Sequence, residues 1–127
     1  MSTIQNDLMY TKEHEWARQE GAEWVIGITD YAQGELGDVV FVELPEPGKV
    51  LGEGDSFGTV EAVKTVSDLY APLAGKVKAV NEKVKSDPTA VNRDPYGEGW
   101  LVRIEASGAP AGLLDAAAYA SLIGQTL

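Results

Sequence analysis

The chain has no cysteine among its 127 residues, and its only histidine is His14. Without thiols it cannot form a disulfide, a thiolate metal site or a cysteine nucleophile. Any sulfur redox chemistry must therefore come from an attached group. No cluster of His, Asp and Glu has the spacing of a metal site, and the glycine-rich pieces lack the spacing of a phosphate-binding loop.

Basic residues and long apolar runs are also scarce. The 20 acidic and 10 basic residues give a formal charge of -10, which repels phosphate backbones and anionic membrane surfaces. No apolar run approaches the roughly 20 residues of a membrane-spanning helix. The N-terminal residues lack the features of a signal or transit peptide. We therefore expect no nucleic-acid or membrane partner, and a cytoplasmic location.

What the chain does have is a series of short β-rich segments separated by turn formers. Residues 9–28 predict a hairpin around QEGAEW, and further strands are expected in DVVFVELP, GTVEAV, SDLYAP, GKVKAV and WLVRIEA. The residues of the first hairpin that we expect to be buried are Trp16, Trp24, Val25 and Ile26. This pattern predicts a mainly β fold of two small antiparallel sheets, in a single domain over residues 1–127.

Helices are expected to be short. Thr29 or Asp30 can cap a helix that ends at Gly37, and Asp115 can cap a C-terminal helix that ends before Gly124. NEKVK can form one helical turn, and the rest of residues 81–100 is dense in turn formers. We therefore predict a surface loop there.

The stretch GTVEAVKTVSDLYAP, residues 58–72, places Lys64 between β-branched residues and the turn formers Ser67 and Asp68. It predicts a strand, a turn with Lys64 at its apex, and a second strand. A solvated turn lysine is one interpretation. A Schiff-base nucleophile needs a depressed pKa, which the carboxylates of Glu61 and Asp68 oppose. An amine presented for acylation by another enzyme explains the pattern better.

The segment VEAVKTVSDLYAP resembles the lipoyl-lysine segment of the glycine cleavage system H-protein family. The similarity continues through YTKEHEW, IGITDYAQGELGDVVFVELPEPG and VNRDPYGEGWL, and so covers nearly the whole chain. It implies a lipoyl-type barrel-sandwich hybrid with short helices and a C-terminal helix. Ala62 replaces the serine that is usual in the family, and Arg93 replaces a usual glutamate.

By this resemblance, Lys64 carries lipoate in amide linkage, attached by a separate lipoylating enzyme that recognises the flanking Glu61 and Val63. The attached group would supply the sulfur that the chain lacks. Biotin is the competing cofactor, but its acceptor lysine is typically flanked by methionines, and here the neighbours are Val63 and Thr65. The resemblance implies a carrier without a catalytic site of its own.

The resemblance also implies partners and a binding site for the loaded arm. An aminomethyl group would pass from glycine decarboxylase to aminomethyltransferase, and dihydrolipoyl dehydrogenase would reoxidise the arm. Glu15 and Asp68 are the candidates to bind the cationic end of the loaded arm, and Glu13, at a position that is often serine, could add a further acceptor. His14, beside Trp16 on a presumed strand, is expected to have a structural or rim-contact role.

Two alternatives share the same scaffold. The protein could donate lipoate in a relay to other complexes, or it could be an interaction module with an unmodified lysine. A carrier that visits several enzymes should bind each one transiently, so we expect a monomer.

Overall fold

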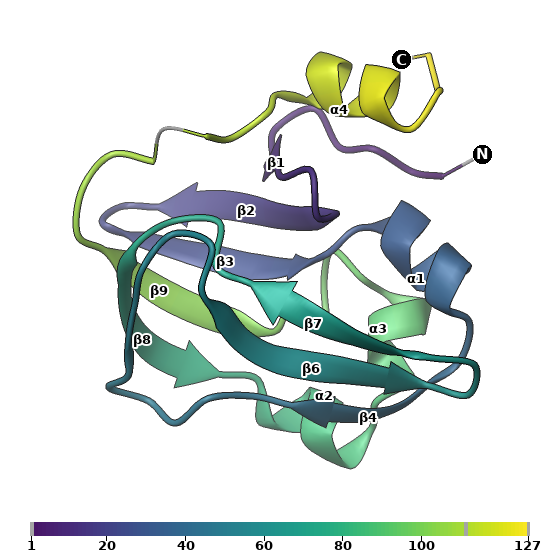
Figure 1. Cartoon of the computed structure of the whole chain (residues 1–127), viewed down its shortest axis with the longest axis horizontal. Helices are drawn as coiled ribbons and strands as arrows, with labels where there is room; N and C mark the ends of the chain where they lie inside the picture. The colour runs from purple at the N-terminus through teal and green to yellow at the C-terminus, as the bar shows by residue number, and fades with distance from the viewer. Residues whose placement is uncertain (1, 111, 127) are drawn as a thin grey trace.

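Two antiparallel sheets and four short helices make up the computed structural model, which describes residues 2–110 and 112–126 (Figure 1). The first sheet has the order β1-β2-β3-β9-β8-β5 and the second has the order β4-β6-β7. The strands are β1 Met9–Tyr10, β2 Glu15–Glu20, β3 Glu23–Ile28, β4 Val39–Glu43, β5 Val50–Leu51, β6 Ser56–Ala62, β7 Val66–Tyr70, β8 Gly75–Val80 and β9 Val102–Ala106. The helices are α1 Asp30–Leu36, α2 Glu82–Ser86, α3 Ala90–Arg93 and α4 Ala116–Leu122.

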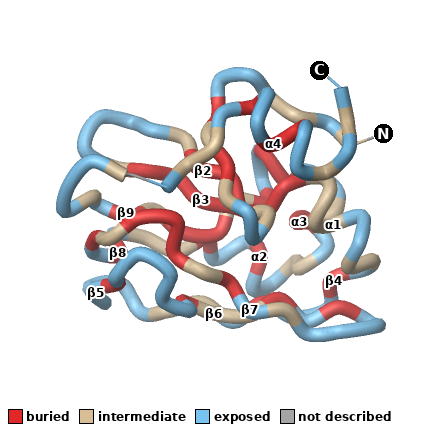
Figure 2. The backbone as a smooth tube through the Cα atoms, turned by 45° about the horizontal axis from the view of Figure 1, so that its top comes forward, coloured by how far each residue is buried: buried red, intermediate tan, exposed pale blue. Residues whose placement is uncertain are grey.

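The main core lies between the two sheets. In β8 and β9, buried apolar side chains alternate with more exposed ones, whereas β2 and β3 bury runs of consecutive residues. The core joins residues of both sheets in one cluster, which includes Ile26, Ile28, Val60, Leu69 and Ile104. Figure 2 shows the buried stretches of β2, β3 and β9 gathered in the interior of the molecule. This shared core holds the second sheet against the first.

A second cluster packs the C-terminal helix onto the first sheet. Tyr119 of α4 stacks on Tyr10 of β1 with ring centroids 4.6 Å apart, and both side chains are fully buried. The backbone of Tyr10 exchanges two hydrogen bonds with Leu114, which precedes the helix. Both ends of the chain are thereby tied to the same edge of the sheet (Figure 1).

The predicted mainly β fold of two antiparallel sheets with short helices and a C-terminal helix is confirmed. One sheet is larger than expected, because it has six strands. The hairpin of β2 and β3 is confirmed, and its four predicted core residues are buried. Thr29 caps α1, which ends at Gly37, and Asp115 caps α4, with Gly124 just beyond its end.

The surface loop predicted for residues 81–100 is wrong in part. After the expected helical turn α2, the chain forms a further short helix, α3, and buries Ala90 and Val91 completely. The Asn92 amide then donates to the carbonyl of Gly37, and its oxygen accepts from the N–H of Val39. The prediction failed because turn formers surround this apolar pair in the sequence. The segment instead supports the start of β4 through Asn92.

None of the helices in the part of the chain that the structure describes is both long and apolar enough to cross a membrane.

Two glycine-to-alanine substitutions should have opposite effects on stability. At Gly75 of β8, an added Cβ would collide with the Glu105 carbonyl oxygen and approach Cγ2 of Ile104 to 2.6 Å. We expect Gly75→Ala to lower the free energy of unfolding by about 1–3 kcal/mol, because the close-packed strands must move apart.

Gly34 lies in α1, and an added Cβ there would meet no atom within 4 Å. Gly34→Ala should raise the free energy of unfolding by about 0.5–1 kcal/mol, because alanine loses less backbone entropy in a helix. Urea unfolding of both variants measures the two effects, and equal changes at the two positions would contradict the close packing described for Gly75.

Candidate functional site

The hairpin of β6 and β7 places Lys64 at its tip. The N–H of Ala62 donates to the carbonyl of Thr65 at 2.8 Å and closes a tight turn over residues 63–65. The N–H of Val63 donates to the carbonyl of Asp38 at 3.1 Å, which ties the tip to the chain before β4. The side chain of Lys64 is exposed. The strand-turn-strand apex predicted for Lys64 is therefore confirmed.

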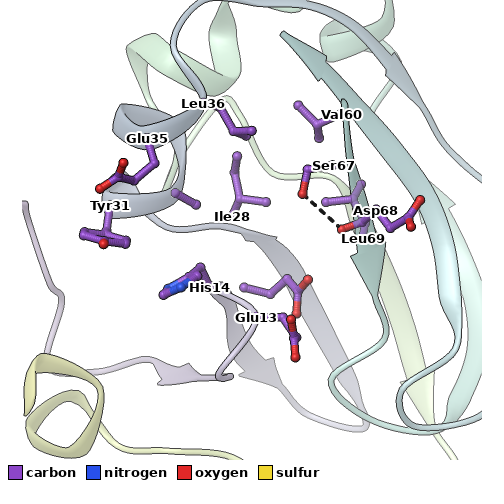
Figure 3. Close-up of a pocket in the computed structure, with 12 residues that line it drawn as sticks. Glu13, His14, Ile28, Tyr31, Glu35, Leu36, Val60, Ser67, Asp68 and Leu69 are labelled. Atoms are coloured by element: carbon purple, nitrogen blue, oxygen red, sulfur yellow. Dashed lines mark hydrogen bonds between the residues drawn. The ribbon is translucent and has the colours of Figure 1, made fainter. Parts of the chain in front are cut away.

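A cavity of about 290 Å³ lies alongside this hairpin, between α1, the turn before β2 and the inner face of β6 and β7 (Figure 3). Its apolar lining comes from both sheets and from α1, through Ile28, Ala32, Leu36, Val60 and Leu69. Its acidic lining residues are Glu13, Glu15, Glu35 and Asp68, and the carboxylate of Asp68 points away from the cavity (Figure 3). No lysine or arginine is among the described residues that line it.

Glu15 is the buried acid of this site, with 1% of its surface exposed. Its carboxylate accepts a hydrogen bond from the Thr11 hydroxyl at 2.8 Å and another from the backbone N–H of Tyr70 at 3.1 Å. Tyr70 is in the other sheet, at the free edge of β7. Burial raises the pKa of Glu15 to about 7, and the hydrogen bonds from Tyr70 and Thr11 oppose this increase.

The turn before β2 holds Glu15 in place. The hydroxyl of Thr11 accepts from the backbone N–H groups of Glu13 and Glu15, at 3.2 Å each, while it donates to the Glu15 carboxylate. His14 completes the turn with a positive φ of 68°, which costs a residue with a Cβ about 1 kcal/mol or more. The sequence motif YTKEHEW is thus a compact turn that precedes the strand.

His14 does not lie on the strand where its sequence neighbours suggested it would. Its Nδ1 lies 2.9 Å from the Tyr119 hydroxyl, which in turn lies 2.7 Å from the hydroxyl of Thr29. Burial lowers the pKa of His14, so the neutral imidazole is favoured. His14 therefore connects the cavity wall to α4, which is compatible with the structural role expected for it.

The remaining predicted residues lie around the cavity in different ways. Glu13 is exposed at the cavity and also borders a second hollow on the other side of Glu15. The Asp68 side chain is exposed and points away from His14, since the next residue, Leu69, faces the core (Figure 3). The Asp68 carbonyl accepts from the Ser67 hydroxyl at 3.5 Å. Glu61 and Val63 are exposed near Lys64.

Sequence reasoning missed the contribution of α1 and α4 to this site. Tyr31, Glu35 and Leu36 of α1 line the cavity, and the ring of Tyr31 lies 5.0 Å from that of His14. The capping signals predicted the helix, but they carry no information about the surface it faces. The spacing of Tyr31 and Glu35, four residues apart on one helix face, is the signal that could have indicated a shared wall.

This arrangement favours a cation. The carboxylates of Glu13, Glu15 and Glu35 around one apolar cavity, without a basic side chain among the described lining residues, give a negative potential that ammonium groups neutralise. Across residues 2–110 and 112–126, no three His, Cys, Asp or Glu residues lie close enough together to hold a metal ion.

The fold and the site define a class: a β scaffold that presents one exposed lysine on a tight hairpin beside an acidic, apolar cavity. Comparison with known proteins identifies the family within this class. The family model described as glycine cleavage H-protein matches residues 8–125. The chain belongs to the glycine cleavage H-protein family, and it is a lipoyl carrier protein of the glycine cleavage system.

Individual relatives agree over almost the full length. The chain is similar to a glycine cleavage system H protein of Herpetosiphon aurantiacus, with 56% identity over 94% of this chain and 92% of the relative. A glycine cleavage system H protein of Symbiobacterium thermophilum is 57% identical over 94% of each chain. The crystal structure of a glycine cleavage system H protein from Mycobacterium marinum has a TM-score of 0.90 and 42% identity, covering 95% of this chain and 99% of the other.

The buried carboxyl group of Glu15 should make stability depend on pH. Its pKa is 4.5 in the unfolded chain and about 7 in the folded protein, so between these values the folded state holds a proton that the unfolded state releases. The stability that comes from this bound proton is fully present below pH 4.5, and it is lost as the pH rises through 7. Glu15→Gln should gain up to roughly 3 kcal/mol of stability relative to the parent between pH 4.5 and pH 8.

Urea unfolding of the parent and of Glu15→Gln at several pH values measures this difference. Glu105→Gln is the matched control, because Glu105 is an exposed glutamate on β9. A stability difference between parent and Glu15→Gln that stays constant across the pH range would show that Glu15 titrates normally in the folded protein.

Proposed function

We propose that Lys64 carries lipoate in amide linkage and that the protein shuttles an aminomethyl group from glycine decarboxylase to aminomethyltransferase. Membership of the H-protein family supports the system, and the exposed amine at the hairpin tip supports the attachment site. The observation that carries the proposal is the exposed Lys64 at the tip of a hairpin whose strands line an acidic cavity with an apolar wall.

The residues present fit a lipoyl group. When attached, the group supplies the disulfide and dithiol chemistry that a chain without cysteine cannot provide. A lysine with a lipoyl chain spans roughly 14 Å when extended. Asp68 at the cavity is four residues from Lys64, or roughly 13 Å along a strand. The arm is thus long enough either to reach the cavity or to enter the active site of a partner.

The cavity would hold the loaded arm out of water. Its apolar side chains suit the aliphatic part of the arm, and its carboxylates suit the cationic amine at the end. Glu15 is our main candidate to bind this amine, because its carboxylate is buried and held by Thr11 and Tyr70. Below pH 7, a cation that binds there would displace a proton from Glu15. We propose Glu13 as a further acceptor, and Asp68 as one that meets the amine at the rim of the cavity after its exposed side chain changes rotamer.

The proposed partners follow from this cycle. They are glycine decarboxylase, aminomethyltransferase, dihydrolipoyl dehydrogenase, which reoxidises the arm, and the enzyme that lipoylates Lys64. The protein itself acts as a carrier rather than an enzyme, as a monomer in the cytoplasm. A lipoate relay to other complexes would use the same lysine, and reconstituted glycine oxidation with the partner enzymes distinguishes the two functions.

Mass spectrometry can test the attachment site directly. After incubation with a lipoylating enzyme and lipoate, peptides covering residues 58–76 should carry one lipoyl group on Lys64, and Lys64→Arg should carry none. An interaction module with an unmodified lysine would show no added mass. Lipoate on a different lysine would also rule out the proposed site.

Loss of the aminomethyl group from the arm tests the role of Glu15. Glu15→Gln removes the charge of the carboxylate that we expect to bind the amine, so the loaded variant should lose the group about tenfold faster. Intact mass over time gives the rate, and Glu105→Gln is the control with the same change of charge. Equal loss rates in Glu15→Gln and the parent would remove Glu15 from the proposed mechanism.

A further inference from the structure

Large apolar side chains are exposed next to the hairpin tip. Among the described residues, six large hydrophobic side chains are substantially exposed, and four of them lie on the second sheet and its hairpin. We call these four residues the hairpin patch: Val40 at 51%, Phe41 at 51%, Val63 at 73% and Val66 at 59% exposed. Val50 on β5 and Leu122 on α4 lie elsewhere. Grouped apolar exposure of this kind marks an interaction surface more often than scattered single residues do.

The register of the sheet brings the hairpin patch together. Phe41 of β4 lies opposite Glu61 of β6, which lies opposite Val66 of β7. An irregularity in β4 between Val39 and Phe41 leaves both Val40 and Phe41 exposed, where strict alternation would bury one of them. Since bulges of this kind redirect side chains, the outward position of two apolar residues is built into the backbone.

The surroundings of the hairpin patch are acidic. Asp38, Glu43, Glu61 and Asp68 are exposed on or beside the same three strands. In β4, β6, β7 and the hairpin turn, Lys64 is the only basic residue. Acylation converts its ammonium group to a neutral amide, so it removes the only positive charge of these strands and their turn. A complementary partner therefore has an apolar centre and a basic rim.

The position of the hairpin patch favours one partner over the others. An enzyme that acylates Lys64 must bring its catalytic centre to the Lys64 amine itself, whereas the enzymes that act on the loaded arm meet its far end, roughly 14 Å away. Three residues of strand separate Glu61 from Lys64, or roughly 10 Å. An ordinary interface of about 800 Å² per partner, centred on Lys64, covers a radius of roughly 16 Å and so includes the hairpin patch.

We propose that Val40, Phe41 and Val66, together with Val63, form the docking surface for the lipoylating enzyme, which meets them with an apolar centre and a basic rim. This inference rests on the proposed lipoylation of Lys64. It extends recognition from the residues next to Lys64 in the sequence to a neighbouring strand, β4. Phe41 is the largest side chain of the surface and should contribute most to binding.

The double variant Phe41→Thr/Val66→Thr tests this surface. Threonine is β-branched and suits a strand; it removes the aromatic ring of Phe41 and replaces one methyl group of Val66 with a hydroxyl. The kcat/KM for lipoylation, followed by intact mass, should fall at least about tenfold, mainly through KM. The matched control Val50→Thr makes the same kind of change on β5 and should stay within about twofold of the parent. A parental rate in the double variant would overturn the proposal.

Two further measurements keep the test independent of folding and of the proposed function. Urea unfolding identifies a double variant that has lost its fold. In that case Val66→Thr alone replaces it, because a single change at an exposed position perturbs the fold little, and the kcat/KM for lipoylation should fall about threefold. Raising the salt concentration should increase the KM of the parent, because it screens the acidic rim from a basic partner. A KM independent of salt would contradict the basic rim.

The downstream reaction separates the two proposals. The double variant can be lipoylated to completion at a high concentration of the lipoylating enzyme. It should then support glycine oxidation at the parental rate. An equal defect in this reaction would show that the surface serves the downstream enzymes and would overturn the assignment to the lipoylating enzyme. If the parent itself acquires no lipoate on Lys64, the proposed function fails, and the docking surface fails with it.

Discussion

The carboxylate of Glu15 joins the two sheets, and the geometry of the site depends on it. It belongs to β2 in the six-stranded sheet, and it accepts the backbone N–H of Tyr70 at the free edge of β7. That N–H would otherwise lack a partner strand, and an unsatisfied buried donor is costly. The bond therefore holds the edge of β7 at a defined distance from the turn that precedes β2, and the cavity lies beside this contact.

The burial of this carboxylate is unfavourable for its charged form, and it raises the pKa of Glu15 to about 7. A packed apolar side chain at this position would avoid that cost but would offer nothing to a cation. The structure thus retains a buried acid whose two neutral donors, Thr11 and Tyr70, do not offset the loss of hydration of its charged form. The positive φ of His14 is a backbone strain that the surrounding fold must offset. Tyr119, which stacks on Tyr10, holds the turn in place through its hydroxyl contact with His14.

Charge and apolar exposure divide the molecule into surfaces with different tasks. On the inner side of β6 and β7, carboxylates surround an apolar cavity that suits a small cationic group. On the outer side, the hairpin patch presents apolar side chains within an acidic rim, which suits a protein. Lys64 stands at the tip where the two sides meet. An arm of roughly 14 Å attached there would be long enough to reach either the cavity or the solvent.

The sequence by itself determined the elements and the family. Alternation, turn formers and caps such as Thr29 and Asp115 depend on residues close together in the chain, so strands, helix ends and the Lys64 apex could be predicted from them. Tertiary structure alone decided the partner of Glu15, the wall formed by α1, the burial of Ala90 and Val91, and the outward turn of Val40 and Phe41. Such features depend on contacts between segments far apart in the chain, and the contact between His14 and Tyr119 joins residues 105 positions apart. A local sequence pattern does not indicate which distant segments will pack together.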